Sequence, residues 1–427
     1  MPAVVSSPIS EAAGGLGPAG LDRTVLASLA DAFAAVPDPR SGQGRRHPLT
    51  TILLIATCAV TCDANGFTAM WQWAADAPQE VLTRLGARMD PLSGARLAPS
   101  ERTIRRTVAR VDPQAVQDAA GVFVAARLAA FGLGQAEPGT SVREREQRRA
   151  ARAERDRTRP PKRPTRRRLA FDGKALRGAR GPGGKRVNLL AAACHDTGTV
   201  IGQRVIDTKT NEIPELRRLI AGMDLTGCLL TADAAHCQKA TAEAVIAAGG
   251  DYLLTLKANQ TALLQAVTAL FAGTDTDWAN RAHDSVDRGH ARTEQRTVRV
   301  TAATGIDFPY AAQVFRTVRY AGALDGQRTR KQVVYGITSL SAQSATRADI
   351  AQAQRGHWGI ENRTHHVRDT TFDEDRCQIR TGHAPQNTAA LRNLAIDTLR
   401  ASGHANIAHA RRHHTHDYNR VLNLYGL

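Results

Sequence analysis

The chain has 427 residues, which is enough for two or three domains of ordinary size. Hydrophobic residues make up 42% of it, so folded cores are expected and wholesale disorder is excluded. Lysine and arginine number 57 against 40 acidic residues, and the net charge of +17 favours a polyanionic partner, with nucleic acid first. A GC-rich coding bias toward arginine is the alternative source of this composition, although it does not explain the sign of the charge.

Neither a membrane span nor an export signal is expected. No apolar run approaches the roughly 20 residues that cross a bilayer. The N-terminus lacks a basic patch followed by an apolar stretch, as a secretory signal would have. The six cysteines include no CxxC pair, which argues against a disulfide framework or a zinc ribbon. We therefore expect a cytoplasmic, nucleoid-associated protein.

The first 135 residues have a helical pattern. Residues 1–20 are small and dotted with proline, glycine and serine, so a flexible N-terminus is expected there. Residues 21–135 carry apolar side chains at helical spacing and predict an all-helical N-terminal domain that binds DNA. Its segments lie at 21–35, 49–60, 66–75, 100–111 and 113–131.

The segment 100–111 has a basic face. Ser100 can cap the helix, and Ile104 and Val108 repeat at i, i+4 with Arg105 and Arg106 on the opposite side. Two interpretations stay open, the recognition helix of a helix-turn-helix or an ordinary amphipathic helix with a solvated basic face.

Residues 136–168 are expected to be a basic linker. The block 143–168 holds 13 basic and 4 acidic residues, and three prolines lie near its end. Such a block is typical of an exposed, poorly ordered segment. It can follow a phosphate backbone or hold two domains apart, and these roles do not exclude each other.

From residue 169 the pattern alternates between strands and helices. Three strands, then helix, strand, helix, strand and helix, predict a mixed sheet flanked by helices over 169–271. Residues 272–342 show strand signals without a helix between them and predict an antiparallel β-strand insertion. Residues 343–427 return to helices and complete the core. The inserted strand signals lie at 295–301, 312–319 and 333–338. The later helices lie at 346–359 and 386–401, and the second is predicted to be a long amphipathic helix.

Three carboxylates could carry chemistry. Asp172 lies on a predicted strand among apolar residues, and Asp233 ends another buried strand. Burying an ionised carboxylate costs several kcal/mol unless a cation compensates it. Glu361 lies on a half-buried helix. Two aspartates on adjacent strands and a glutamate on a packing helix can hold two divalent metals for in-line phosphoryl transfer, and oxygen ligands without cysteine suit Mg²⁺ or Mn²⁺.

Other interpretations of these residues remain. A single aspartate at a strand end is more often a helix cap or an ion-pair partner. Glu294, on a polar alternating strand, is the rival for the third acid. His357, Glu361 and His365 follow each other at i, i+4, i+8 and form a candidate zinc site, although no HExxH motif is present.

Several motifs together resemble the H-repeat-associated insertion-sequence transposases, a branch of the DDE superfamily. The resemblance covers residue 36 to the C-terminus, and no single motif carries it. The motifs are Asp172-Gly173-Lys174-Ala175-Leu176-Arg177-Gly178, Asn211-Glu212-Ile213-Pro214, Thr231-Ala232-Asp233-Ala234, His357-Trp358-Gly359-Ile360-Glu361-Asn362 and Ala390-Leu391-Arg392-Asn393-Leu394-Ala395, with Pro37-Asp38-Pro39-Arg40 and Arg46-His47-Pro48-Leu49 nearer the N-terminus.

The resemblance implies an RNase H-like core with a DDE triad at Asp172, Asp233 and Glu361, interrupted before the glutamate by the β-strand insertion. It also implies two Mg²⁺ or Mn²⁺ ions, double-stranded DNA as partner at element ends and target, and a homodimer in the DNA complex. Related cut-and-paste transposases surround the glutamate with a tyrosine–arginine–glutamate–lysine signature. The corresponding positions here are Gln354, His357 and Arg368.

Basic and polar residues near the predicted site are candidate DNA contacts. Lys257 follows a strand and opens a helix, where a phosphate can bind. Arg292 and Arg296 alternate onto one face of the first inserted strand. The full set of predicted contacts is Lys257, His357, Arg368, Arg292, Arg296, Arg105 and Arg106.

The sequence predicts an enzyme that cleaves DNA at element ends and joins the freed 3′ hydroxyl to target DNA. Two alternatives remain: a catalytically silent or domesticated DNA-binding relic, and a nuclease that does not join strands. Sequence alone does not separate the last from a transposase, because both use the same metal chemistry.

Overall fold

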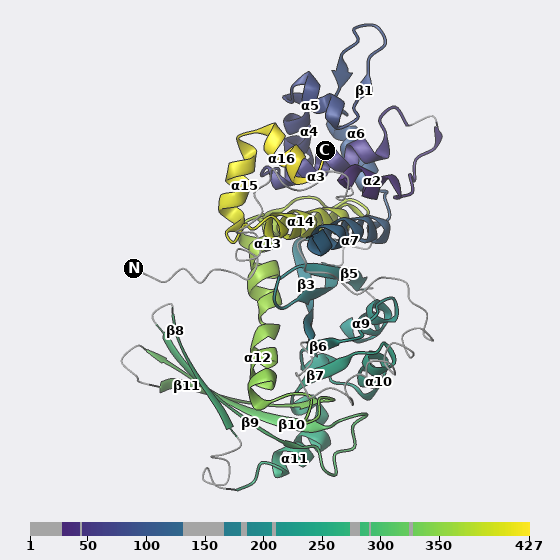
Figure 1. The fold of residues 1–427 in the computed structure, drawn as a ribbon. Coiled ribbons are helices and arrows are strands. Elements are labelled where there is room, and N and C mark those ends of the chain that lie inside the picture. The colour runs from purple at the N-terminus through teal and green to yellow at the C-terminus, as the bar shows by residue number, and fades with distance from the viewer. Residues whose placement is uncertain are drawn as a thin grey trace.

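The computed structural model describes residues 28–42, 45–130, 166–180, 186–206, 211–273, 282–289, 292–323 and 328–427 (Figure 1). The predicted flexible N-terminus lies outside the described residues, and so does the predicted basic linker up to residue 165. None of the helices in the described part is long and apolar enough to cross a membrane.

The N-terminal region is mostly helical, with one exception. A two-stranded hairpin lies between its fourth and fifth described helices, so the prediction of an all-helical domain is wrong at this point. Asp90 explains the turn, since its side chain accepts a hydrogen bond from Ser93 and Gly94 takes a positive φ of 70°. The elements are α2 (Leu29–Ala34), α3 (Leu49–Thr61), α4 (Phe67–Ala75), α5 (Gln79–Arg84), β1 (Arg88–Met89), β2 (Arg96–Leu97), α6 (Glu101–Val108) and α7 (Pro113–Ala130).

Both ends of the described chain share one apolar core. Phe33 and Leu53 from the N-terminal helices pack in the same buried cluster as Leu394, Val421 and Tyr425 from the C-terminal ones. Figure 1 shows the purple and yellow helices gathered together. The C-terminal elements are α14 (Ala384–Ala401), α15 (Ile407–Thr415) and α16 (Tyr418–Leu424). The C-terminal helices therefore complete the core of the helical part.

Helix α14 is buried along its whole length. Every residue of α14 except Arg400 is buried, including Arg392, Asn393 and Asp397. The predicted amphipathic helix is therefore wrong about a solvent face. The reason is its location, because α14 packs against α3 and α7 on one side and against β4 and β5 on the other.

A single nine-stranded mixed sheet forms the second half of the molecule, which confirms a mixed sheet flanked by helices. Its order is β5-β4-β3-β6-β7-β11-β10-β9-β8. The pairs β3–β6 and β6–β7 are parallel and the other pairs are antiparallel. The strands are β3 (Arg167–Arg180), β4 (Arg186–Cys194), β5 (Val200–Ile206), β6 (Cys228–Ala232), β7 (Asp251–Leu256), β8 (Ala282–Gly289), β9 (Arg292–Ala302), β10 (Gln313–Ala323) and β11 (Arg328–Thr338).

The strands of 272–342 extend this sheet and do not build a separate one. β11 pairs antiparallel with β7 from Tyr335↔Leu256 to Thr338↔Leu253. The described part of this range holds four strands, where the sequence pattern predicted three, and the additional strand is β8 at the sheet edge. The pairing joins the insertion rigidly to the strand that follows β6.

Helices cover both faces of the sheet. One face carries α9 (Glu212–Ala221), α10 (Lys239–Ala247) and α11 (Thr261–Ala269), with the 3₁₀ turns η3 (Ala234–His236) and η4 (Ala258–Gln260). On the other face α12 (Arg347–His357) packs Ile350 and Ala353 against Leu253 and Phe315. A π-helical turn (Glu361–His365) and α13 (His366–Thr370) continue α12, and the 3₁₀ turn η7 (Glu374–Arg376) follows. In Figure 1, α12 runs from the inserted strands toward the helical part.

Candidate active site

Asp172 and Asp233 come from neighbouring parallel strands. The last paired residues of β3 and β6 are Phe171 and Ala232, and each aspartate is the next residue on its strand. Asp233 also caps η3, because its Oδ1 accepts the Ala235 backbone N–H at 3.0 Å. The two aspartates line one cavity. Asp233 therefore has the capping role that a strand-end aspartate often has, and it reaches the cavity as well.

Glu361 approaches Asp172 from the helical segment that follows α12. It is the first residue of the π-helical turn, in which the His366 backbone N–H donates a hydrogen bond to the Glu361 carbonyl oxygen. π turns inside α-helices are frequent at functional sites. His365 Nδ1 lies 3.0 Å from Glu361 Oε2 and 3.5 Å from Asp172 Oδ2. One ligand atom from each of these three residues lies within 4.8 Å of the others, and Asp233 is not part of this tighter group.

The charges at this site favour a bound cation. Burial raises the pKa of Asp172 to about 6; nearby His365 opposes the rise, and the negative charges of Glu361 and Glu212 add to it. The hydrogen bond from His365 lowers the pKa of Glu361. The two close carboxylates of this group are oxygen ligands of the kind that bind divalent cations, and the imidazole lies beside them.

A buried polar network holds strand β3, which carries Asp172, against the helical segment that carries Glu361. Lys174, two residues after Asp172, donates to both oxygens of Asp369 at 2.6 and 2.7 Å. Asp369 lies one helical turn beyond His365. Glu374 accepts two bonds from Arg368, each 2.9 Å long, and one from Arg392 at 3.0 Å. Burial opposes ionisation of Glu374, but these cations outweigh it and lower its pKa to about 2.

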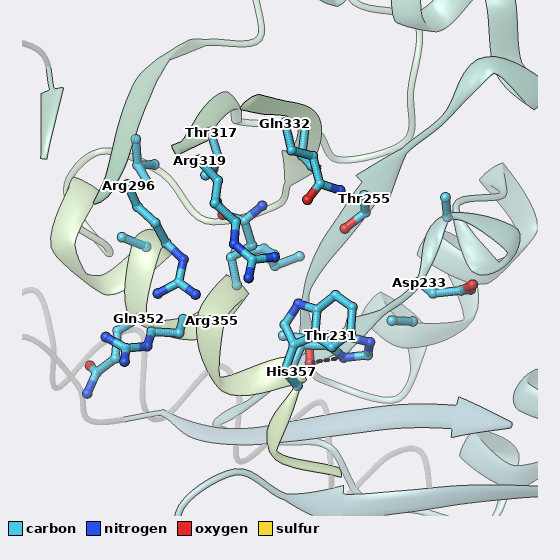
Figure 2. Close-up of a pocket in the computed structure, with 18 of the residues that line it drawn as sticks. Thr231, Asp233, Thr255, Arg296, Thr317, Arg319, Gln332, Gln352, Arg355 and His357 are labelled. Atoms are coloured by element: carbon cyan, nitrogen blue, oxygen red, sulfur yellow. Dashed lines mark hydrogen bonds between the residues drawn. The ribbon is translucent and has the colours of Figure 1, made fainter. Parts of the chain in front are cut away.

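A cavity of about 730 Å³ extends from the carboxylates toward the inserted strands. Arg296, Arg319 and Arg355 line its far part, and Figure 2 shows them around the space opposite Asp233. These arginines are held by two acids. Arg296 and Arg355 pair with Asp287 at 3.0 and 2.7 Å, and Arg319 donates to Glu294 at 2.9 Å. The cavity thus joins an acidic end to an arginine-rich end.

Neither alternative metal or acid set is supported. Glu294 is occupied by ion pairs to Arg296 and Arg319 and does not line the cavity. In the candidate zinc set, His357 turns elsewhere: its Nδ1 lies 3.1 Å from Thr231 Oγ1 (Figure 2). Only Glu361 and His365 of that set come together.

His357, a predicted DNA contact, lines the cavity as a neutral group. Burial lowers the pKa of His357 to about 4. Thr231 Oγ1 connects it to His195, whose Nε2 is 2.8 Å away and whose pKa burial lowers to about 3. A neutral imidazole can exchange hydrogen bonds with DNA but supplies no positive charge to a phosphate.

The other predicted DNA contacts are found in different settings. Lys257 is exposed on the cavity and Arg296 lies inside it. Arg105 and Arg106 are exposed on α6, far along the chain from the cavity. Arg292 begins β9, and its side chain lies outside the described part of the structure.

The prediction for Arg368 needs correction. Its side chain is 0% exposed and bound to Glu374, so it cannot reach DNA in this conformation. Helix α13, which carries Arg368, faces the sheet and α14. The Arg368 guanidinium belongs to the buried network around Glu374.

Sequence reasoning missed the roles of Lys174, Arg319 and Arg355. Lys174 lies two residues after Asp172, but its partner Asp369 is 195 positions away in the chain and is not evident from the sequence. Arg319 lies directly opposite Arg296 on β10, a relation that only the strand register reveals. Arg355 faces the same acid, Asp287, from α12.

Comparison with known proteins adds a consistent picture. A family model described as "Transposase DDE domain" matches residues 163–397, and one described as "DDE_Tnp_1-associated" matches residues 30–124. The chain is 26% identical over 383 residues to a protein named as a transposase, YncI of Escherichia coli O157:H7, with 88% of each chain covered. It is 27% identical over 385 residues to a protein named as an H repeat-associated transposase, YhhI of Escherichia coli strain K12, covering 88% of this chain and 90% of that one.

One solved structure is similar at a greater distance. It is a piggyBac transposase synaptic complex with hairpin DNA, 10% identical, with a TM-score of 0.41, and the match covers 93% of this chain and 74% of that one.

Proposed function

The chain belongs to the transposase DDE-domain family, on its H-repeat-associated branch, and we propose that it cleaves DNA at element ends and transfers the strands into target DNA. Asp172, Asp233 and Glu361 are the proposed catalytic carboxylates. The observation that carries the proposal is their convergence on one cavity from β3, from the end of β6 and from the π turn after α12.

The sheet supports an RNase H-like core. Strands β5, β4 and β3 are antiparallel and β3, β6 and β7 are parallel, with helices on both faces. Strands β8 to β11 interrupt the chain between β7 and α12, so the insertion comes before Glu361 in sequence.

The proposed cofactor is Mg²⁺ or Mn²⁺, as two ions. Asp172, Asp233 and Glu361 would hold them, with His365 beside the carboxylate oxygens of Asp172 and Glu361. Two such cations, when bound, stabilise the attacking and leaving oxygens of an in-line phosphoryl displacement. The chain itself orients the carboxylates, since Lys174–Asp369 ties the strand of Asp172 to the helix of Glu361.

Double-stranded DNA is the proposed partner, at element ends and at the target. Arg296, Arg319 and Arg355 can exchange their acidic partners for phosphates, and Lys257 adds a charge on the same cavity. Pairing two element ends requires a homodimer in the DNA complex, which the family resemblance implies. Association with the nucleoid would follow from DNA binding.

The test is Mg²⁺-dependent cleavage and strand transfer on DNA that carries the flanking element ends. Wild type and Asp233→Asn are compared, with DNA binding measured in parallel. Loss of both reactions in the variant, with binding retained, supports the proposal. Cleavage without joining by wild type, given a 3′-hydroxyl donor, indicates a nuclease instead. Binding without cleavage by either protein indicates a DNA-binding relic.

A further inference from the structure

A fourth carboxylate lies against the strand of Asp172. Gly173 follows Asp172 on β3, and a Cβ atom built at this glycine would lie 2.1 Å from Glu212 Oε1 and 2.5 Å from its Cδ. Real Cβ atoms do not approach other atoms this closely. The carboxylate of Glu212 therefore occupies the space that any other residue at position 173 would fill.

The chain holds Glu212 there through two further residues. The Asn211 side chain caps α9 by accepting the Ile213 backbone N–H at 3.1 Å, which places Glu212 in the first helical turn. His236 Nε2 lies 3.6 Å from Glu212 Oε2. His236 is 1% exposed, and neither of its ring nitrogens has a hydrogen-bond partner among the described residues. Since His236 lies three residues after Asp233, Glu212 is connected to the strands of both aspartates.

Glu212 approaches β3 from the face opposite Glu361. Side chains alternate along β3, and Phe171 packs with Leu216 of α9, whereas Ala170 packs with Ile360 beside Glu361. Asp172 therefore points toward the side of Glu361, and Gly173 toward the side of Glu212. The missing side chain at position 173 is what lets a carboxylate from α9 come close to the strand at this point.

A purely structural role does not account for these features. A glutamate in the first turn of a helix is stabilised by the helix dipole without any need for a glycine opposite it. Glu212 is 40% exposed, so water could have solvated it. Instead its carboxylate lies against the β3 backbone at Gly173, and its negative charge contributes to the raised pKa of Asp172, the next residue back. A divalent cation bound to both carboxylates would relieve this repulsion between like charges.

We propose that Glu212 is a fourth carboxylate ligand of the catalytic site and binds a divalent cation from the α9 side, together with Asp172. This inference rests on the proposed function. His236 is a positioning residue, which holds the Glu212 carboxylate, and Gly173 provides the space.

The test measures Mn²⁺ binding directly, by electron paramagnetic resonance on the full-length chain bound to element-end DNA that is already cleaved. Glu212→Gln is compared with Glu243→Gln, which removes the same charge from an exposed position on α10. Loss of a ligand should weaken Mn²⁺ binding by about tenfold or more. Cleavage by Glu212→Gln should then need correspondingly more Mn²⁺, and Glu243→Gln should match wild type.

Gly173→Ala provides a second route, because it keeps the Glu212 carboxyl group and displaces it. We expect the same loss of Mn²⁺ affinity, and the double variant should be no weaker than Glu212→Gln alone, since both changes act on one contact. Thermal unfolding verifies that each variant is folded, and Glu212→Asp replaces Glu212→Gln if that variant is not.

The outcomes separate the inference from the proposed function. If wild type cleaves and Glu212→Gln binds Mn²⁺ as wild type does, the inference is overturned whether or not the variant cleaves, and the proposed function stands. If wild type neither binds Mn²⁺ nor cleaves, both are overturned. Additive losses in the double variant would also count against Glu212 as the group that Gly173 accommodates.

Discussion

Asp172 illustrates how a single residue links stability to cation binding. Its pKa of about 6 is above its ordinary value of 3.8, so the folded protein resists ionisation of this group. The free energy of unfolding is therefore not reduced by this group below pH 4. It falls as the pH rises from about 4 to 6, and the full reduction is present above that range. We expect Asp172→Asn to raise the stability of the cation-free protein at pH 7.5 by on the order of 2 kcal/mol, while cleavage is lost.

Thermal unfolding in a chelator and then in Mg²⁺ tests this prediction. Wild type should gain stability when Mg²⁺ is added, because the ion binds the folded state, and Asp172→Asn should gain much less. Glu243→Gln serves again as the exposed control. If Asp172→Asn were less stable than wild type in chelator, the carboxylate would have a structural partner that outweighs its burial.

Lys174 and Lys239 form a natural comparison between a buried and an exposed ion pair. Each donates to an aspartate at 2.6 Å, but the Lys174 side chain is 7% exposed and that of Lys239 is 54% exposed. Lys174→Met should cost about 3 kcal/mol, since it leaves Asp369 without its cation near buried Glu374. Lys239→Met should cost less than about 1 kcal/mol.

Urea unfolding measures both variants. Lys174→Met should also reduce cleavage more than it reduces DNA binding, because the pair fixes Glu361 relative to Asp172. Equal costs for the two lysines would mean that burial does not strengthen the first pair.

At the scale of elements, the helix carrying Glu361 depends on a close contact with the sheet. A Cβ at Gly356 of α12 would lie 2.4 Å from His195 Nδ1, whereas nothing lies within 4 Å of a Cβ at Gly121 of α7. Alanine is the better helix former at both positions. We expect Gly121→Ala to stabilise the protein by about 0.5–1 kcal/mol and Gly356→Ala to destabilise it by about 1–3 kcal/mol.

Melting temperatures of the two variants decide this prediction. Gly356→Ala should additionally impair cleavage, since pushing α12 away from His195 moves the π turn. A stabilising effect at both glycines would show that α12 has room to shift without loss.

The elements that the sequence predicted correctly are those with a strong apolar pattern. The buried strand β6 and the helices that cover the sheet are examples. β8 was missed because it is an edge strand, and its residues Ala282–Gly289 alternate without a consistent apolar face. β1 and β2 have two residues each, too few for any periodicity.

The residues of the candidate site likewise include some that the sequence predicts and some that it does not. Asp172, Asp233 and Glu361 could be singled out because carboxylates are unusual among apolar strand and helix residues. Arg368 has the same appearance in sequence as any surface arginine, and only its partner Glu374, brought close by the η7 turn, reveals that it is buried. The roles of Arg319 and Lys174 likewise depend on which residues lie opposite them.

At the scale of the whole molecule, the helical part and the sheet part are joined by α14, which packs against α3 and α7 and against β4 and β5. The proposed catalytic site lies in the sheet part, and the exposed arginines of α6 lie in the helical part. Contacts that position a protein on DNA need not be near the chemistry, because phosphate contacts set orientation and carry no sequence information. The two interpretations of α6 can therefore be separated by comparing how the loss of its charge affects binding to element-end DNA and to unrelated DNA.

We expect Arg105→Ala combined with Arg106→Ala to weaken binding to element-end and unrelated DNA by similar factors. Both arginines are exposed, and Arg105 is held by Glu101 at 3.5 Å, which fits a phosphate contact better than base reading. The slope of log affinity against log salt should fall by about 2, one for each lost phosphate contact. Arg412→Ala combined with Arg420→Ala removes the same charge from exposed positions on α15 and α16 and should change the slope less. A loss confined to element-end DNA would instead identify α6 as a recognition helix, because only base contacts distinguish one sequence from another.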